Sequence, residues 1–470
     1  MELDTIAAIA TPLGSSGIGI IRISGTLSLS ITLKLFRMQD HRLSNDTVDP
    51  DHFSTLTAHQ LRYGHICDPE NGQIVDEVLA AYMKAPKSYT REDVVEIQSH
   101  GGPIVQRKIL DLVLRCGARL AEPGEFTKRA FLNGRIDLSQ AEAVAEVISA
   151  KSEAALQLAA HQLTGRMKSI ISSIVQKITS IQAEIEARID FIEDLGDDAE
   201  TKAIRLALNQ EIIMPVRKLL DDYSKGHILR DGLRMDIVGR PNVGKSSLLN
   251  RLIRKEKAIV TPIPGTTRDL VEDYFCIGGI PILITDTAGL HATDDPVEII
   301  GMQKTRDNIL RSDLVLFVID GCAPNETGDE AVFEHINARN IILVVNKCDL
   351  LSSDRQLVLP QQYRHLPTVA VSALNGDGVD DLERTIQEVC LNGVFIDPGR
   401  DLVPTLRQRS ALELAMEPLS RAYESLDEIG SDVLVAEDLE SAKRSLNGIL
   451  GEDVAHDVLD EIFKNFCIGK

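Results

Sequence analysis

The segment Gly239–Ser246 constrains this chain more than any other feature. Its sequence, GRPNVGKS, fits the pattern GxxxxGK[ST] and lies between the apolar run Met235–Val238 and the helix-compatible run Ser247–Asn250. A strand, a glycine-rich loop and a helix in this order let backbone N–H groups surround phosphate oxygens at the positive end of the helix. We predict that Lys245 reaches the β and γ phosphates of a nucleotide and that Ser246 binds Mg²⁺.

Three further patterns follow in the order that a guanine-nucleotide site requires. Asp286–Gly289 (DTAG), Asn346–Asp349 (NKCD) and Ser372–Leu374 (SAL) each come after an apolar, strand-like run. Asp349 can accept hydrogen bonds from the N1–H and N2 amine of guanine, whereas adenine presents a lone pair at N1. The sequence therefore predicts GTP rather than ATP.

The loop Thr261–Asp269 lies between these patterns, and we expect its Thr267 to complete the ligation of Mg²⁺. The residues expected to contact GTP are Asn242, Val243, Gly244, Lys245, Ser246, Ser247, Thr261, Pro262, Ile263, Pro264, Gly265, Thr266, Thr267, Asp286, Thr287, Ala288, Gly289, Asn346, Lys347, Asp349, Ser372, Ala373 and Leu374.

Hydrolysis needs a group that orients the attacking water. Leu290 follows the DTAG pattern and cannot do so, which leaves the acidic side chains of Asp294, Asp295 and Glu298 as candidates. No arginine stands out as a source of positive charge for the transition state. Asn242, together with carbonyl groups of the loop Thr261–Thr266, could instead hold a monovalent cation beside the phosphates.

Length and charge set the limits of the remaining interpretation. At roughly 100 to 200 residues per domain, 470 residues predict two to four domains. The seven cysteines form no CxxC pair, so we expect reduced thiols. The net charge of −21 disfavours non-specific binding of nucleic acid, so any RNA contact must be local or shared with a partner. The first residues lack a basic stretch and no apolar run approaches the roughly 20 residues of a membrane span, so we expect a cytoplasmic protein without a membrane partner.

The pattern of apolar runs and helical periodicity along the chain predicts a multidomain α/β plus α protein. Short β-like runs and one amphipathic helix, Ile104–Arg115, indicate an N-terminal α/β domain at 1–120. Helical periodicity follows at 121–228, where Ser139 and Glu142 have the spacing of a capping box. Apolar runs alternate with helical segments at 229–392, as in a Ras-like domain with a mostly parallel sheet, and helical texture returns at 393–470. The economical arrangement inserts the GTPase domain into the helical domain.

Several motifs outside the nucleotide site resemble those of the bacterial tRNA uridine-modifying GTPase family called MnmE or TrmE, along essentially the whole chain. The motifs are the segments Gly17–Gly25, Tyr89–Asp93, Glu96–Gly102, Pro123–Leu138 and the ending Phe466–Lys470 (FCIGK). The resemblance implies an N-terminal domain that forms a homodimer and binds 5,10-methylene- or 5-formyl-tetrahydrofolate. It places Arg22, Glu96, Arg135 and Lys470 at that folate.

The resemblance also implies hydrolysis stimulated by potassium. It assigns K⁺ to Asn242, Thr261, Ile263 and Thr266, and it selects Glu298 as the catalytic residue that positions the water. With an FAD-dependent partner, MnmG (GidA), in a heterotetramer, the family adds a carboxymethylaminomethyl or aminomethyl group at C5 of the wobble uridine (U34) of certain tRNAs. His291 and Pro296 depart from the family pattern near the catalytic glutamate.

Three alternatives stay open at this stage. The thiol of Cys467 could attack C6 of uracil, or the residue could serve only to pack the folate site. A ribosome-assembly GTPase of the Era or Der type would share the nucleotide motifs, although it favours a basic RNA-binding module where this chain is acidic and helical. A non-catalytic GTP-sensing switch would account for Leu290.

Overall fold

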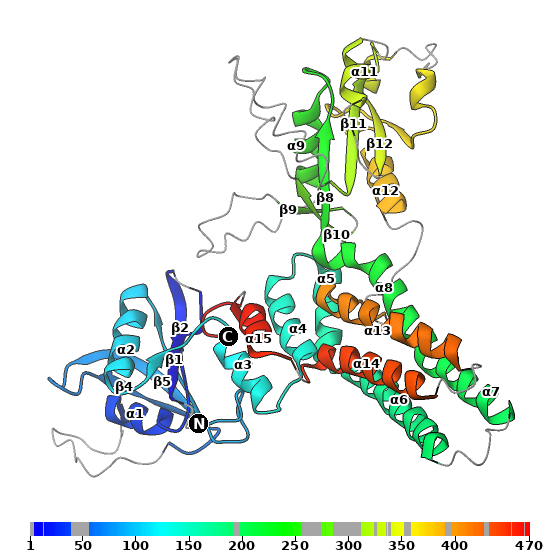
Figure 1. The fold of residues 1–470 in the computed structure, drawn as a ribbon. Helices are drawn as coiled ribbons and strands as arrows, with labels where there is room; N and C mark the ends of the chain where they lie inside the picture. Colours follow the sequence, from blue (N-terminus) through cyan, green and yellow to red (C-terminus); the bar gives the residue numbers. More distant parts are fainter. Residues whose placement is uncertain are drawn as a thin grey trace.

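The computed structural model describes residues 4–12, 14–38, 56–190, 198–255, 274–277, 279–284, 312–323, 327–334, 336, 340–351, 359–390, 397, 399, 401–426, 432–452, 454–464 and 466–470. Figure 1 shows an N-terminal α/β unit, a long helical unit, and a second α/β unit that stands next to α5 and α8, away from α6 and α7. Among the described residues no helix is both long and apolar enough to cross a membrane.

The N-terminal unit is a seven-stranded sheet in the order β3-β4-β5-β6-β2-β1-β7. Its strands are β1 (Ile6–Ile9), β2 (Ser16–Ser24), β3 (Phe36–Met38), β4 (Leu61–Cys67), β5 (Ile74–Met83), β6 (Val94–Gly101) and β7 (Arg119–Leu120). All neighbouring pairs are antiparallel except β1 and β7. Helices α1 (Ser28–Leu35) and α2 (Pro103–Arg115) pack on one face, where alternate strand residues such as Ile21 and Ile97 form the core.

The helical unit is built from two separate stretches of chain. The first supplies α3 (Glu125–Leu132), α4 (Leu138–Ser149), α5 (Glu153–Leu163), α6 (Arg166–Asp190), α7 (Asp198–Ala207), the π-helical turn η1 (Leu208–Ile213) and α8 (Met214–Asp231). The second supplies α13 (Leu406–Ser425), α14 (Asp432–Leu450) and α15 (His456–Lys464). One apolar core joins them, because Ile171 and Ile178 of α6 share it with Leu419 of α13 and Leu439 of α14.

The second α/β unit lies between these two stretches, which confirms the predicted insertion. Its sheet has the order β13-β12-β11-β8-β10-β9, and only the edge strand β9 is antiparallel to its neighbour. The elements are β8 (Leu233–Val238), α9 (Lys245–Lys255), β9 (Tyr274–Ile277), β10 (Ile280–Ile284), β11 (Leu314–Asp320), α11 (Thr327–Phe333), β12 (Ile341–Asn346), β13 (Thr368–Ala370) and α12 (Val379–Cys390). We propose domain boundaries near residues 120, 228 and 392 on this basis.

The capping box predicted at Ser139 is wrong by two residues. Asp137 caps α4, because its side chain accepts from the Gln140 N–H while the Gln140 side chain accepts from the Asp137 N–H. Ser139 lies inside the helix and donates its hydroxyl to Asp137 Oδ1 at 2.5 Å. An aspartate followed three residues later by glutamine forms the same reciprocal pair of hydrogen bonds, here to the N–H groups of residues 137 and 140.

Arg230, in the last turn of α8, joins the two chain segments that connect the helical unit to the inserted unit. Its Nη1 donates to the carbonyl oxygens of Val403 and Pro404 on the returning chain, at 3.2 and 2.5 Å. Its Nε lies 3.6 Å from Oε1 of Glu146 on α4. Burial raises the pKa of Glu146 to about 7, against the opposing effect of Arg230 and with the help of Glu142 and Asp231.

Candidate functional site

The predicted phosphate-binding loop joins β8 to α9 at the carboxyl end of the sheet. Its backbone is left-handed at Asn242, with φ of 63°, and at Gly244, with φ of 98°. A Cβ at Gly239 would lie 2.2 Å from the Val318 carbonyl oxygen, and one at Gly244 would lie 2.2 Å from Nδ2 of Asn346. The loop therefore needs glycine at both positions, because only a residue without a side chain fits against β11 and β12.

Lys245 lies at the start of α9 and folds back over this loop. Its Nζ donates to the carbonyl oxygens of Gly239 and Arg240, both at 2.8 Å. Ser246 and Ser247 follow in the first turn of α9 and are exposed. The ammonium and the serine hydroxyls thus lie where a phosphate and its Mg²⁺ would be bound.

The guanine end of the site is joined to the phosphate end through Asn346. This buried side chain donates from Nδ2 to the Val243 carbonyl oxygen at 2.8 Å and accepts from the Ala373 N–H at 3.0 Å. One residue of the NKCD segment therefore links the phosphate loop to the Ser372–Leu374 loop. Asp349 is exposed beside it, free to accept hydrogen bonds from a base.

Lys347 is held by an acidic residue that the sequence analysis did not single out. Its Nζ lies 2.7 Å from Oδ2 of Asp320, at the end of β11. Burial alone would raise the pKa of Asp320, but its bonds with Lys347 and the Cys322 N–H, and the nearby charge of Arg240, lower it overall. The only sequence signal for Asp320 is its place at the end of an apolar strand.

Part of the predicted site lies outside the described residues. This part comprises Thr261, Pro262, Ile263, Pro264, Gly265, Thr266, Thr267, Asp286, Thr287, Ala288, Gly289 and the expected catalytic Glu298, together with His291 and Pro296. Asn242, Lys245, Ser246, Asn346 and Asp349 are described, and the structure brings the loops that carry them together.

A second cluster joins the N-terminal sheet to the end of the chain. Arg22 of β2 and Glu96 of β6 are direct partners across the two strands, and Arg22 Nε lies 2.8 Å from Glu96 Oε1. Arg22 Nη1 also donates to the carbonyl oxygen of Gly469 at 3.0 Å. Arg135 is exposed and donates to the carbonyl oxygen of Tyr89 at 2.8 Å. Three of the four predicted folate residues therefore converge with the peptide that precedes the fourth, Lys470.

Tyr89 is the residue of this cluster that sequence reasoning missed. Two guanidinium groups lie against its ring, with the guanidinium carbon of Arg135 at 4.6 Å and that of Arg22 at 5.6 Å from the ring centroid. Its hydroxyl is 3.0 Å from the Thr127 hydroxyl. The signal available in the sequence was its position in the Tyr89–Asp93 motif, but nothing there indicated that both arginines stack on it.

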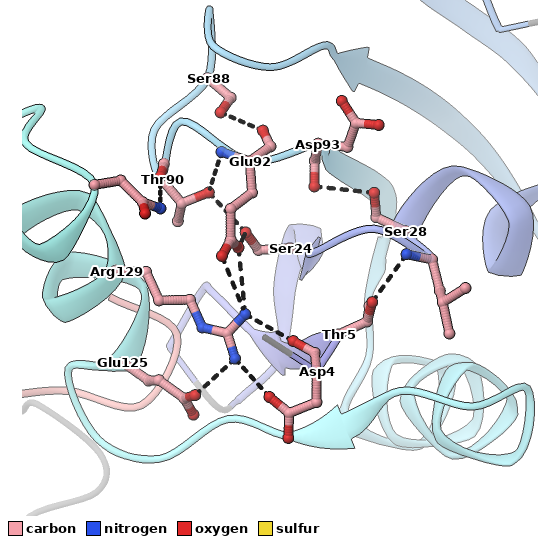
Figure 2. A network of polar contacts seen from close by, with 12 residues as sticks. Asp4, Thr5, Ser24, Ser28, Ser88, Thr90, Glu92, Asp93, Glu125 and Arg129 are labelled. Carbon is pink, nitrogen blue, oxygen red and sulfur yellow. Dashed lines mark hydrogen bonds and ion pairs between the residues drawn. The ribbon is translucent and has the colours of Figure 1, made fainter. Parts of the chain in front are cut away.

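The loop that carries Tyr89 is fixed by a buried polar network, shown in Figure 2. Arg129 of α3, only 3% exposed at its side chain, donates to the Asp4 carbonyl oxygen at 2.7 Å and contacts both carboxylate oxygens of Glu92 at 3.3 Å. Its Nη2 donates to Glu125 at 3.0 Å and to the Asp4 carboxylate at 2.9 Å. Glu92 in turn accepts from Ser24 at 2.6 Å, so strand β2, the loop and α3 are held as one unit.

The carboxyl-terminal residues are anchored on the N-terminal unit by main-chain contacts. The Cys467 carbonyl oxygen accepts from the N–H groups of Gly124 and Lys470, both at 3.3 Å. A Cβ at Gly469, whose φ is 92°, would lie 2.5 Å from the carbonyl oxygen of Ile9. Cys467 itself is exposed, which leaves its thiol accessible beside the cluster.

These features together define a class of protein. A glycine-rich phosphate loop between a parallel strand and a helix, with an Asn-Lys-x-Asp segment docked on it, is the nucleotide site of a P-loop GTPase. Here that GTPase unit is inserted into a helical domain that follows an N-terminal α/β domain.

Comparisons with known proteins place the chain more narrowly. A family model described as the MnmE helical domain matches residues 138–467, and one described as the GTP-binding protein TrmE N-terminus matches residues 5–135. The curated tRNA modification GTPase MnmE of Carboxydothermus hydrogenoformans is 46% identical over 100% of both chains. Those of Moorella thermoacetica and Alkaliphilus oremlandii are 44% and 41% identical over 99% of this chain and of each relative. The chain therefore belongs to the MnmE family of tRNA modification GTPases, and not to the Era or Der type.

Proposed function

We propose that this tRNA modification GTPase is stimulated by potassium and works with the FAD-dependent partner MnmG (GidA). Together they would add a carboxymethylaminomethyl or aminomethyl group at C5 of the wobble uridine (U34) of certain tRNAs, with the carbon supplied by 5,10-methylene- or 5-formyl-tetrahydrofolate. The observation that carries the GTPase part is the Asn346 bridge, because it ties the guanine-recognition segment to the phosphate loop. Turnover is favoured over a non-catalytic switch because the curated relatives are named tRNA modification GTPases.

The proposed catalytic step relies on charge and on positioning. Lys245 would bind the β and γ phosphates, Ser246 and Thr267 would hold Mg²⁺, and Glu298 would orient the attacking water. K⁺ would be held by Asn242, Thr261, Ile263 and Thr266, and its charge would offset the charge that develops between the phosphates. Asn242 fits this role chemically, because it carries an amide oxygen on the exposed side of the phosphate loop.

Steady-state GTP hydrolysis in matched potassium and sodium buffers tests this step. We expect strong stimulation by potassium that disappears in Glu298→Ala and is weakened in Asn242→Ala. A control variant, Asn250→Ala, changes an exposed asparagine of α9 outside the loop and should keep the full stimulation. Equal slow rates in both salts for the unaltered chain would reject the cation mechanism.

The folate is proposed to bind where Arg22, Glu96, Arg135 and Lys470 come together. A carboxylate at the position of Glu96 can accept from the amine and N–H edge of a pterin, and the cationic side chains suit carboxylates and polar ring atoms. Tyr89 adds an aromatic ring next to Arg22, and the ring of Phe126, which also lies near Arg22, is fully buried. Calorimetric titration with 5-formyl-tetrahydrofolate should show binding that Arg22→Ala or Glu96→Gln removes; retained affinity in both variants would place the folate elsewhere.

The open face of the N-terminal sheet supports the proposed homodimer. Helices α1 and α2 cover one face, whereas the opposite face exposes Ile18, Leu61, Tyr63 and Leu79 by 38–60%. The register pairs Tyr63 directly with Leu79 across β4 and β5, so these two side chains share this face. An apolar surface of this kind marks an interface. Light scattering should give a dimer that Leu79→Lys dissociates, and a monomeric unaltered chain would refute the proposal.

The acidic chain is proposed to leave most of the tRNA contact to MnmG in a heterotetramer in the cytoplasm. A net charge of −21 opposes the neutralisation of phosphates that drives affinity for RNA. Tight binding of tRNA by the chain alone at physiological salt would contradict this division of labour.

Cys467 is proposed to pack the folate site rather than to attack the uridine. Its main chain is anchored, and among the described residues its side chain makes no hydrogen bond with a base or a cation. A Cys467→Ser chain that folds and still supports tRNA modification would reject the nucleophile, whereas loss of modification with normal folding would support it.

A further inference from the structure

A second layer of charged side chains lies behind the phosphate loop. Nε of Arg240 lies 2.6 Å from Oδ1 of Asp329 on α11, and the two side chains are 17% and 1% exposed. Arg240 Nη2 also points to the carbonyl oxygen of Ala323 at 3.4 Å, in the segment that leads from β11 to α11. The second residue of the phosphate loop is therefore tied to the structure that follows β11.

The backbone of Arg240 takes part in the site itself. Its carbonyl oxygen accepts from Lys245 Nζ at 2.8 Å, the same ammonium that we expect to reach the phosphates. The next residue is Pro241, whose ring restricts the backbone of Arg240 to extended conformations. With the backbone restricted and the side chain anchored, the peptide on which Lys245 rests has little freedom.

The packing around the pair indicates that it is built for this contact. Gly328 lies beside the stem of Arg240, and a Cβ there would be 2.6 Å from the arginine Cδ. The other carboxylate oxygen of Asp329, Oδ2, is buried and has no hydrogen-bond partner among the described residues. Arg240 thus balances a buried carboxylate, and removal of Arg240 leaves that carboxylate without its ion-pair partner.

We propose that Arg240 and Asp329 are a positioning pair that holds the phosphate loop in its binding shape and thereby sets the rate at which GDP leaves. Neither residue needs to touch the nucleotide, because the pair acts through the loop backbone and Lys245. The proposal depends only on guanine-nucleotide binding and stands apart from the potassium, folate and tRNA steps.

The guanine end of the site provides an internal reference. Apart from the Asn346 bond to Val243, it is held by contacts that involve neither Arg240 nor Asp329, namely the bond from Ala373 to Asn346 and the ion pair of Lys347 with Asp320. Loss of the pair should therefore weaken the hold on the phosphates and leave base selection intact. The preference for GDP over IDP, which lacks the N2 amine that Asp349 would bind, reports on the guanine end alone.

The test uses the full chain and a fluorescent GDP analogue followed by stopped flow. We expect Asp329→Asn to release GDP roughly tenfold faster, as the loss of one charged hydrogen bond implies, and Arg240→Lys to show a smaller increase. Gly328→Ala should also speed the release of GDP, because the added Cβ displaces Arg240. Alanine favours a helix more than glycine does, so faster release would not reflect a weaker α11. Glu330→Gln, a neighbouring exposed carboxylate on α11, is the matched control and should leave the rate unchanged.

Competition between GDP and IDP, measured on the same variants, separates positioning from general loosening. If the pair positions the phosphate loop, the variants should release GDP faster while the ratio of the GDP and IDP affinities stays unchanged. Unchanged release in Asp329→Asn and Gly328→Ala would overturn the proposal, and so would a ratio that collapses together with the rate.

Discussion

The ionisation of the Glu146 carboxyl group opposes folding, so replacement of Glu146 by glutamine should raise the stability of the folded chain at neutral pH. Burial raises its pKa from 4.5 to about 7 although Arg230 lies nearby. Between these two values the unfolded carboxyl group has lost its proton while the folded one keeps it, so stability falls as pH rises and the loss is complete above pH 7. A shift of this size corresponds to about 3 kcal/mol.

Glu146→Gln removes this loss because an amide does not ionise. We expect the variant and the unaltered chain to unfold at similar temperatures near pH 4.5 and to diverge as pH rises. At pH 8 the variant should unfold at a temperature higher by roughly 6 to 12 °C, if the helical unit behaves as a cooperative domain. Scanning calorimetry of the full chain at a series of pH values measures the difference.

The matched control lies one turn earlier on the same helix. Glu142 accepts hydrogen bonds from Nη2 of Arg407 at 3.0 Å and from Gln408 at 2.8 Å, so its charge is compensated. Glu142→Gln should therefore lower the unfolding temperature at neutral pH, the opposite of Glu146→Gln. A Glu146→Gln chain that gains nothing at pH 8, or gains equally at every pH, would refute the reasoning.

Three further predictions concern the two clusters. Asp349→Asn should lower the affinity for GTP roughly 10- to 100-fold and raise the affinity for xanthine nucleotides, because the amide can donate a hydrogen bond where the carboxylate accepted one. Competition binding measures both affinities, and an unchanged affinity for GTP would contradict the base-recognition role. Tyr89→Leu should weaken the binding of 5-formyl-tetrahydrofolate roughly tenfold, because Arg22 and Arg135 lose the ring on which they stack. Tyr89→Phe keeps the ring and should bind nearly normally. An equal loss of folate affinity in the two variants would assign the effect to the hydroxyl. Arg129→Leu should destabilise the N-terminal unit by about 3 to 5 kcal/mol, because it leaves buried carboxylates without their cation. Arg119→Leu changes a side chain that is 43% exposed and should destabilise the unit far less. Similar losses of stability in the two variants, measured by chemical denaturation, would argue against the buried network.

The parts of the fold that sequence predicted well are those dominated by one local signal. The strands β11 and β12 are almost entirely apolar and buried, and β8 is apolar apart from the exposed Arg234 and the buried Asp236. The predicted ranges of all three agree with the structure to within two residues at either end. The amphipathic spacing that predicted a helix at Ile104–Arg115 likewise matches α2. Short elements such as β7 and α1 had no comparable pattern, because they are stabilised by contacts with distant strands.

The candidate sites divide in the same way. The phosphate loop and the Asn346–Asp349 segment were predictable because their chemistry is encoded in consecutive residues. The cation–ring stack at Tyr89 and the pair of Arg240 with Asp329 join residues far apart in the chain, so only the structure shows them. The resemblance to the family placed Arg22, Glu96 and Arg135, which spacing alone would have left as unrelated surface charges.

The central claim is that GTP hydrolysis by this chain serves tRNA modification. The most direct test reconstitutes the purified chain with MnmG, FAD, a one-carbon tetrahydrofolate, an amine donor and unmodified tRNA, and follows the wobble uridine by mass spectrometry. We predict a C5-aminomethyl-type product that requires GTP and is lost when GTP is replaced by a non-hydrolysable analogue. Formation of the same product with the analogue, or in the absence of this chain, would contradict it.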